Sequence, residues 1–329
     1  MRLVDETGLI ARFLGHPTPA LPRGSIGPGA DDAAVVPWDG LEDLVVTSDL
    51  VAEGVHFFTA ADPFAVGRFL VAVNLSDLAA MGAVPRGFLA SYGATRDQGG
   101  VWLERVAEGV ADALTTWECP LMGGDTKEAG RTVLSGTALG AVPHGRAVRR
   151  AGGGVGDVLV VTGPVGGKGA LLERLAREEL SEEEVSKGLL DVAPRLKAGV
   201  ALRLAGATAM TDLSDGLARG ARLIAAASGL GARLEAEAVP VASAVEALWG
   251  EPRPDDPEWR RVVLGTGGEY ELLAALPPDR VGRARQALQE VGSDCVPVGS
   301  LDRGDGVRLV ALQEGPWPLE GLGWRHFRS

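Results

Sequence analysis

Short apolar runs of strand length alternate with longer segments of helical period along this chain. Strands are expected at residues 31–38, 43–51, 86–94, 132–142, 158–163, 208–215 and 262–277. Helices are expected at residues 62–82, 100–118, 169–180, 181–192, 216–229 and 279–292, and a loop at 252–259. Because strands that alternate with helices build mixed layers, the pattern predicts an α/β (α+β) protein.

The composition turns to glycine and arginine around residues 145–157, which indicates a junction between two domains of similar size. The predicted domains are residues 1–148 and 149–329. A chain of 329 residues, 46% of them hydrophobic, is long enough to build both cores. In the second domain, Ser181 and Glu184 have capping-box spacing at the start of a helix.

Charge and cysteine content argue against several classes of protein. The net charge of −12 disfavours a nucleic-acid partner, since that affinity comes from clustered Lys and Arg. Cys119 and Cys295 lie far apart without a CxxC motif, so neither a disulfide framework nor a zinc site is expected. We find no apolar run that approaches a membrane span and no signal peptide, so we expect no membrane partner and a cytoplasmic location.

Seven aspartates recur in similar settings, most of them next to glycine, serine or threonine at the end of an apolar run. They are Asp31, Asp32, Asp49, Asp77, Asp125, Asp212 and Asp215. Any one of them is explained as a turn or helix-cap residue, because aspartate accepts hydrogen bonds from free backbone N–H groups. The recurrence of the whole set favours a shared site.

Asp77 is the most informative of these aspartates. In the predicted helix, Val66, Leu70 and Val73 form an apolar stripe, and the next step of four residues arrives at Asp77. A buried ionised carboxylate is costly unless it is paired or binds a metal. Pairing with the nearest basic residues, Arg68 or Arg86, and metal binding both stay open at this point.

Several carboxylates brought together need cations, because two unit charges 4 Å apart repel by about 4 kcal/mol at an intermediate dielectric. Oxygen ligands, with the hydroxyls of Thr47, Ser48 and Ser214 alongside, suit hard ions such as Mg²⁺. The pattern therefore suggests an enzyme in which Mg²⁺ bridges an acidic protein to a nucleotide phosphate.

The stretch "VLVVTGPVGGKGALL" places a glycine-rich turn between a strand and a helix. Three residues separate Gly163 from the Gly-Lys pair, whereas a P-loop needs four, and Gly169 stands where Ser or Thr would hold Mg²⁺. No G-x-G-x-x-G fingerprint can be placed there either. These glycines therefore indicate tight turns, and an anion at this helix start stays open.

The motifs "DDAAVV", "TSDLVAEGVHF", "NLSDLAAMGA", "GGDT", "TDLSDG" and "GGEYEL" occur in an order that resembles the thiamine-monophosphate kinase family. That family belongs to a superfamily with aminoimidazole ribonucleotide synthetase, selenophosphate synthetase and the hydrogenase-maturation dehydratase. The resemblance runs from about Gly27 to Trp324. It implies a homodimer of two-domain chains whose N-terminal strands form a barrel with those of the partner, beside which ATP lies.

The resemblance also implies a set of site residues. Metal-ligand positions fall on Asp32, Thr47, Ser48, Asp49, Asp77, Asp125, Asp212 and Asp215. Positions that touch ATP fall on Gly124, Asp125, Arg150 and Ser214. Positions around thiamine monophosphate fall on His56, Glu269 and Trp324. Among these, the indole of Trp324 suits stacking on a flat cationic ring, and Arg150 offers a planar fork for phosphate.

The chain departs from the family pattern in two places. The family reads G-x-G-D-D, whereas "GPGADD" inserts Ala30, so either Asp31 or Asp32 takes the metal position, and we prefer Asp32. The family reads G-G-E-D-Y-E-L, whereas "GGEYEL" lacks the aspartate. The loss of one residue reverses the faces of a following strand unless a local bulge absorbs it, which puts the role of Glu269 in question.

The resemblance implies Mg²⁺-dependent transfer of the ATP γ-phosphoryl group to thiamine monophosphate, giving thiamine diphosphate and ADP. No general base is required, because the acceptor phosphate is already an anion. Two alternatives stay open. One is an ATP-dependent relative that activates an amide oxygen, as aminoimidazole ribonucleotide synthetase does. The other is a catalytically silent nucleotide or metal sensor.

Overall fold

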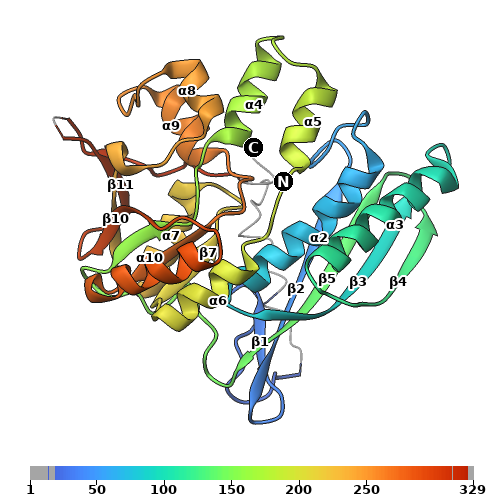
Figure 1. The fold of residues 1–329 in the computed structure, drawn as a ribbon, viewed down its shortest axis with the longest axis horizontal. Coiled ribbons are helices and arrows are strands. Elements are labelled where there is room, and N and C mark those ends of the chain that lie inside the picture. Colours follow the sequence, from blue (N-terminus) through green and yellow to red (C-terminus); the bar gives the residue numbers. More distant parts are fainter. Residues whose placement is uncertain (1–13, 15–18, 313, 325–329) are drawn as a thin grey trace.

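The computed structural model describes residues 14, 19–312 and 314–324, and it contains two mixed sheets with helices packed on them (Figure 1). One sheet has five strands in the order β1-β2-β5-β3-β4, and the other has seven in the order β12-β11-β8-β10-β6-β9-β7. The α/β (α+β) prediction is confirmed.

The five-stranded sheet comes from the first half of the chain. Its strands are β1 (Ala34–Pro37), β2 (Glu42–Ala52), β3 (Val84–Ala94), β4 (Leu121–Glu128) and β5 (Val133–Pro143). Helices α2 (Pro63–Ala80) and α3 (Gly99–Thr116) lie together on one face (Figure 1). Strands β2 and β5 pair antiparallel over eleven residues, and alternate residues of β2 are buried because side chains of a strand point to opposite faces in turn.

Helix α2 lies at the centre of the molecule. Asp62 caps its start by accepting from the Phe64 N–H at 3.1 Å, and Pro63 occupies the first helical position, where its missing N–H costs nothing. Most of its residues are buried because it contacts the sheet, α3 and α6. A Cβ on Gly199 of α6 would lie 2.0 Å from the Ala79 carbonyl oxygen, so the helices approach this closely only with glycine there.

By length and composition alone, α2 is apolar enough to cross a membrane, although no apolar run of that length was expected. Within the molecule, however, 72% of this 18-residue helix is buried among protein groups, as expected of a helix in a protein core.

The seven-stranded sheet comes from the second half. Its strands are β6 (Val158–Val161), β7 (Ala209–Asp212), β8 (Gly231–Glu235), β9 (Leu272–Leu276), β10 (Val296–Asp302), β11 (Val307–Val310) and β12 (Trp317–Pro318). Its α-helices are α4 (Gly167–Ala176), α5 (Glu182–Leu190), α6 (Leu196–Ala205), α7 (Leu217–Ser228), α8 (Ser243–Trp249), α9 (Pro257–Arg260) and α10 (Val281–Glu290). Short helical turns η1 (Ala236–Ala238), η2 (Arg261–Gly265) and η3 (Pro278–Arg280) complete this half.

Strand β9 shows how this sheet builds two cores. Leu272 and Ala274 pack in the cluster that contains α6, α10 and the end of α2, whereas Leu273 and Ala275 pack in the cluster that contains α7. The end of α2 thus belongs to the core of the second sheet, so this helix joins the two halves.

Several expected elements differ from the structure. The strand expected at 262–277 is a π-helical turn at Arg261–Gly265, an irregular loop, and a strand only at Leu272–Leu276. Gly267 and Gly268 adopt φ of 77° and 89°, which a continuous strand does not permit. The loop expected at 252–259 includes the start of α9. The elements that were not predicted are β4, β8, β10, β11, β12, α6 and α8. The capping box at Ser181 and Glu184 is confirmed.

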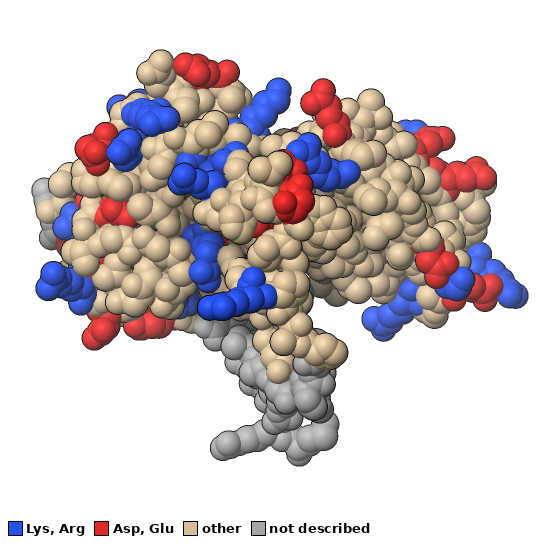
Figure 2. Space-filling model, turned by 90° about the horizontal axis from the view of Figure 1, so that it is seen from below, with Lys and Arg blue, Asp and Glu red and all other residues tan. Residues whose placement is uncertain are grey.

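Acidic and basic side chains are interspersed on the face seen from below (Figure 2). The acidic excess of the chain is therefore not gathered on that face. Asp31, Asp43 and Asp212 instead belong to the buried residues.

Candidate active site

A cavity of about 510 Å³ lies between the two halves of the molecule. Strand β2 and helix α2 supply one wall, and the loops after β7 and before β9 supply another. Of the residues predicted for the site, Asp32, Thr47, Ser48, Asp49, His56, Asp77, Arg150, Ser214, Asp215 and Trp324 line it. Segments far apart in the sequence therefore meet around one space.

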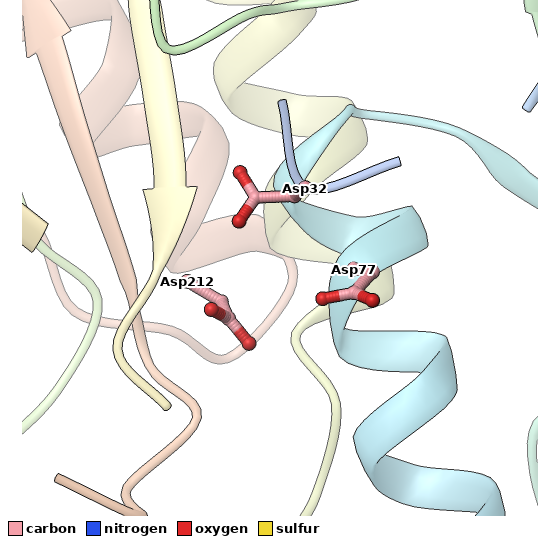
Figure 3. Close-up of side chains that lie close together, drawn as sticks. All are labelled: Asp32, Asp77 and Asp212. Atoms are coloured by element: carbon pink, nitrogen blue, oxygen red, sulfur yellow. The ribbon is translucent and has the colours of Figure 1, made fainter. Parts of the chain in front are cut away.

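Three carboxylates from three different elements point toward one another in Figure 3. Asp32 comes from the loop before β1, Asp77 from the last turns of α2, and Asp212 from the end of β7. One oxygen of each lies within 4.8 Å of the others. The recurrence of aspartates favoured a shared site, and three of them bring carboxylate oxygens from both halves to one point.

Hydroxyl groups fix two of these carboxylates. Thr47 Oγ1 donates to Asp77 Oδ2 at 2.5 Å. Asp212 accepts from Ser76 Oγ at 2.7 Å and from Ser214 Oγ at 2.9 Å, and Ser76 belongs to α2, in the other half of the chain. Each carboxylate is therefore oriented before any ion binds.

Asp31 and Asp32 take different roles. Asp32 faces the cluster and accepts from Arg150 Nη2 at 2.5 Å and from Thr211 Oγ1 at 3.0 Å. Asp31 accepts instead from the Arg150 backbone N–H at 3.0 Å and from Arg149 Nε at 3.4 Å. Of the two adjacent aspartates, Asp32 is therefore the one that faces the cluster.

The cluster carries more negative charge than its surroundings stabilise. Burial, with repulsion from Asp212, raises the pKa of Asp32 to about 7. The same two causes raise the pKa of Asp49 to about 6, and burial with repulsion from Asp49 raises the pKa of Asp77 well above its ordinary value. Carboxylates in this state bind a divalent cation favourably, because the cation removes their repulsion. All-oxygen ligands of this kind fit Mg²⁺.

Gly124 and Asp125 lie elsewhere. They belong to β4, the edge strand of the five-stranded sheet, whose eight residues are all exposed, and neither lines the cavity. Asp125 accepts from Lys127 Nζ at 3.0 Å. Within the described part of a single chain, these two residues are not brought to the carboxylate cluster.

Glu269 does not line the cavity either. Its carboxylate lies at the start of α4, where it accepts from the Lys168 backbone N–H at 3.2 Å, and burial raises its pKa to about 7. The sequence left open whether an anion binds at this helix start. The structure places the Glu269 carboxylate there, where the helix dipole favours negative charge. Lys168 Nζ donates to the Asp191 carbonyl at 2.7 Å.

Three residues at or near the cavity were missed from the sequence. Ser76 and Asn74 both precede Asp77 in "NLSDLAAMGA", and Asn74 Oδ1 accepts from the Asp49 N–H at 2.9 Å. Their polarity inside an apolar helix was a usable signal. Tyr270 lines the cavity, and nothing in the local pattern distinguished it from the strand expected there.

Comparison with known proteins places both halves of the chain in one family. Residues 30–142 match the family model for the AIR synthase related protein, N-terminal domain, and residues 154–311 match that for its C-terminal domain. The chain is 34% identical over 314 residues to the thiamine-monophosphate kinase of Synechococcus elongatus, and the alignment covers 91% of each chain. It is 32% identical over 330 residues to the thiamine-monophosphate kinase of Salmonella typhimurium, and this alignment covers 98% of each chain.

Solved structures have the same fold. The thiamine-monophosphate kinase from Stenotrophomonas maltophilia superposes with a TM-score of 0.75 at 31% identity, covering 91% of this chain and 93% of that one. AaThiL complexed with AMPPCP and TMP superposes with a TM-score of 0.80 at 27% identity, covering 99% of both chains.

Proposed function

This chain belongs to the thiamine-monophosphate kinase family, and we propose that its cavity transfers the γ-phosphoryl group of ATP to the phosphate of thiamine monophosphate. The products are thiamine diphosphate and ADP. The observation that carries the proposal is the meeting of Asp32, Asp77 and Asp212 from both halves of the chain at one point, beside a cavity that Asp32 and Asp77 line. The relative that was solved with AMPPCP and TMP supports the two substrates.

Asp32, Asp77 and Asp212 would hold Mg²⁺, with Asp49, Asp215, Thr47 and Ser48 as further ligands around the same cavity. Bound Mg²⁺ supplies positive charge between the two phosphate groups and to the transferring phosphoryl group. Among this chain's residues, Thr47 and Ser76 fix the orientation of the carboxylates, and the cavity aligns donor and acceptor.

Arg150, Ser214, Gly124 and Asp125 are the proposed contacts of ATP, and His56, Glu269 and Trp324 those of thiamine monophosphate. Arg150, Ser214, His56 and Trp324 line the cavity, which supports their part of the proposal. Glu269 does not line the cavity, so it would contribute to this part of the site from the start of α4, where its carboxylate lies.

We also propose a homodimer that joins the N-terminal strands into a barrel, with residues 1–148 and 149–329 as the two domains. The face of the five-stranded sheet away from α2 carries Val46, Leu50, Leu89 and Leu139, and no helix of the described residues covers it. Edge strand β4 exposes Leu121 and Met122 by 59% and 61%. An apolar sheet face beside an open edge favours association with another chain. In such a dimer, Gly124 and Asp125 lie at the interface. We place the enzyme in the cytoplasm, with no membrane or nucleic-acid partner.

The test is to incubate the protein with ATP, Mg²⁺ and thiamine monophosphate, with unphosphorylated thiamine as the control, and to follow products by phosphorus NMR. Thiamine diphosphate and ADP are expected only with the monophosphate. ATP binding without thiamine diphosphate would contradict the proposal and direct attention to amide-activating relatives or to a silent nucleotide sensor. Sedimentation of the protein tests the dimer separately.

A further inference from the structure

Tyr270 has a backbone conformation that is unusual for its residue type. Its φ of 55° lies in the left-handed region, which bulky side chains adopt at a cost. Glu118 and Glu178 are the other described non-glycine residues with positive φ, and neither lines the cavity. Tyr270 does line it, two residues before β9 begins. Such strain persists only where the surroundings hold it, and it often serves a site.

Both neighbours of Tyr270 are anchored away from the cavity. The Glu269 carboxylate accepts from the Lys168 N–H at the start of α4. The buried Glu271 carboxylate accepts from Arg195 Nε at 2.8 Å and from Thr162 Oγ1 at 2.6 Å. The left-handed turn between these anchors directs the tyrosine into the cavity.

The tyrosine ring is held by packing. It meets the Phe69 ring edge to face, with the ring centroids 6.0 Å apart and the planes at 82°. Aromatic pairs favour this geometry. The side chain therefore has a defined position in the cavity.

The Tyr270 hydroxyl differs from the other hydroxyls of the cavity wall. Thr47 donates to Asp77, Ser48 to the Gly136 carbonyl, and Ser214 to Asp212. Within residues 19–312 and 314–324, no hydrogen-bond partner of the Tyr270 hydroxyl is found. The basic side chains that line the cavity also have partners. Arg150 pairs with Asp32, and Lys168 donates to backbone carbonyls at the end of α5.

The phenol of Tyr270 is neutral at neutral pH, because the ordinary pKa of tyrosine is about 10. The phenol therefore keeps its proton at neutral pH and acts as a donor. A wall lined by carboxylates presents mainly acceptors, so a free donor there suits an anionic group of a substrate.

Tyr270 follows Glu269, a proposed contact of thiamine monophosphate, and its loop is connected to Trp324, another such contact. Its loop is joined to the loop after β7, because the Gly268 N–H donates to the Ser214 carbonyl at 2.8 Å. The Trp324 N–H donates to the carbonyl of the next residue, Asp215, at 3.2 Å. Tyr270 and Trp324 thus extend from one wall, and Trp324 is a proposed contact of thiamine monophosphate.

We propose that Tyr270 is a further substrate-positioning residue, whose phenolic hydroxyl donates a hydrogen bond to a phosphate oxygen of thiamine monophosphate. The inference rests on the proposed function and deepens it. No proton is transferred, because the hydroxyl only orients the attacking phosphate.

Tyr270→Phe tests this inference, because it keeps the ring against Phe69 and removes only the hydroxyl. Tyr92→Phe is the matched control, since Tyr92 is the other tyrosine of the chain and does not line the cavity. KM for each substrate and kcat are measured for both variants and the wild type. Calorimetry gives the affinities for thiamine monophosphate and unphosphorylated thiamine, and thermal unfolding checks the fold.

For Tyr270→Phe we expect KM and Kd for thiamine monophosphate to rise by about 10-fold to 100-fold, the usual effect of losing a hydrogen bond to a charged group. KM for ATP and the affinity for unphosphorylated thiamine are expected to stay at wild-type values, as are all values for Tyr92→Phe. Unchanged affinity for thiamine monophosphate would overturn the inference. An equal loss with thiamine, or a loss confined to ATP, would overturn it as well. Failure of the proposed function is distinguishable, because the wild-type enzyme would then form no thiamine diphosphate.

Discussion

Ser76 on α2 donates a hydrogen bond of 2.7 Å to Asp212 at the end of β7, although 136 positions separate the two residues in the chain. Both side chains are buried. The bond joins the helix that carries Asp77 to the strand that carries Asp212, so it sets the distance between two proposed Mg²⁺ ligands. Partners of this kind orient metal ligands and tune their affinity.

Replacing Ser76 by alanine is expected to raise the Mg²⁺ concentration needed for half-maximal activity by about 10-fold, because Asp212 loses a donor that orients it. The measurement is a Mg²⁺ titration of turnover at saturating substrates. Ser186→Ala is the control, since Ser186 is also buried but its hydroxyl has no partner in the described chain. A Mg²⁺ requirement equal to that of Ser186→Ala would rule out this role.

Asp77→Asn is expected to lower kcat by about 100-fold or more, because a ligand and one negative charge leave the Mg²⁺ site. The metal-free variant is expected to melt at a higher temperature than the wild type, since one of the repelling carboxylates is gone. Turnover and thermal unfolding without Mg²⁺ check the two effects. Asp97→Asn, at an exposed position outside the cavity, should leave both unchanged. Near-normal turnover of Asp77→Asn would remove Asp77 from the site.

The stability of the metal-free protein is expected to fall as pH rises. Asp32 and Asp49 have ordinary pKa values of 3.8 and folded-state values of about 7 and about 6. Between these limits the folded state binds protons that the unfolded state has released, so deprotonation costs the folded state free energy. Melting temperature without Mg²⁺ should therefore decrease from about pH 4 to about pH 7.

Added Mg²⁺ should raise the melting temperature more near pH 8 than near pH 5, because the ligands must be deprotonated to bind it. A melting temperature that rises with pH in the absence of metal would show that other groups dominate. Ca²⁺-free and Mg²⁺-free buffers with a chelator define the reference state.

Arg195→Met is expected to lower the free energy of unfolding by about 3 kcal/mol, because it leaves the buried Glu271 carboxylate without its charged partner. Denaturant unfolding measures the change. The exposed Arg96 and Glu128 pair supplies the control, since its side chains are 83% and 61% exposed. Arg96→Met should change the free energy by less than about 1 kcal/mol. Equal effects of the two variants would exclude the anchoring role of Glu271.

Much of the candidate site was predictable because its proposed ligands are marked locally. Asp32, Asp77 and Asp212 each lie in a short motif at the end of an apolar run, and a carboxylate inside an apolar helix has few explanations besides pairing or metal binding. The helix at residues 62–82 and the strands at 43–51 and 132–142 were also predictable, since period and length alone distinguish them.

The loop before β9 was not predictable in this way. Residues 262–277 contain two apolar stretches that are typical of a strand, but the first belongs to the π-helical turn. The packing of Gly267 against the Ser214 carbonyl, with Tyr270 in a left-handed turn, separates the two stretches. Edge strand β4 was missed because its glycines and charges show no alternation.

The sequence by itself determined the kinds of groups at the site, because ligand chemistry is a property of individual side chains. It also determined the α/β class, through the periods of its apolar residues. Only the tertiary structure decided which carboxylates meet, that Ser76 binds Asp212, that Glu269 caps α4 and that Tyr270 faces the cavity. These outcomes depend on contacts between residues far apart in the chain, and such contacts leave no local pattern.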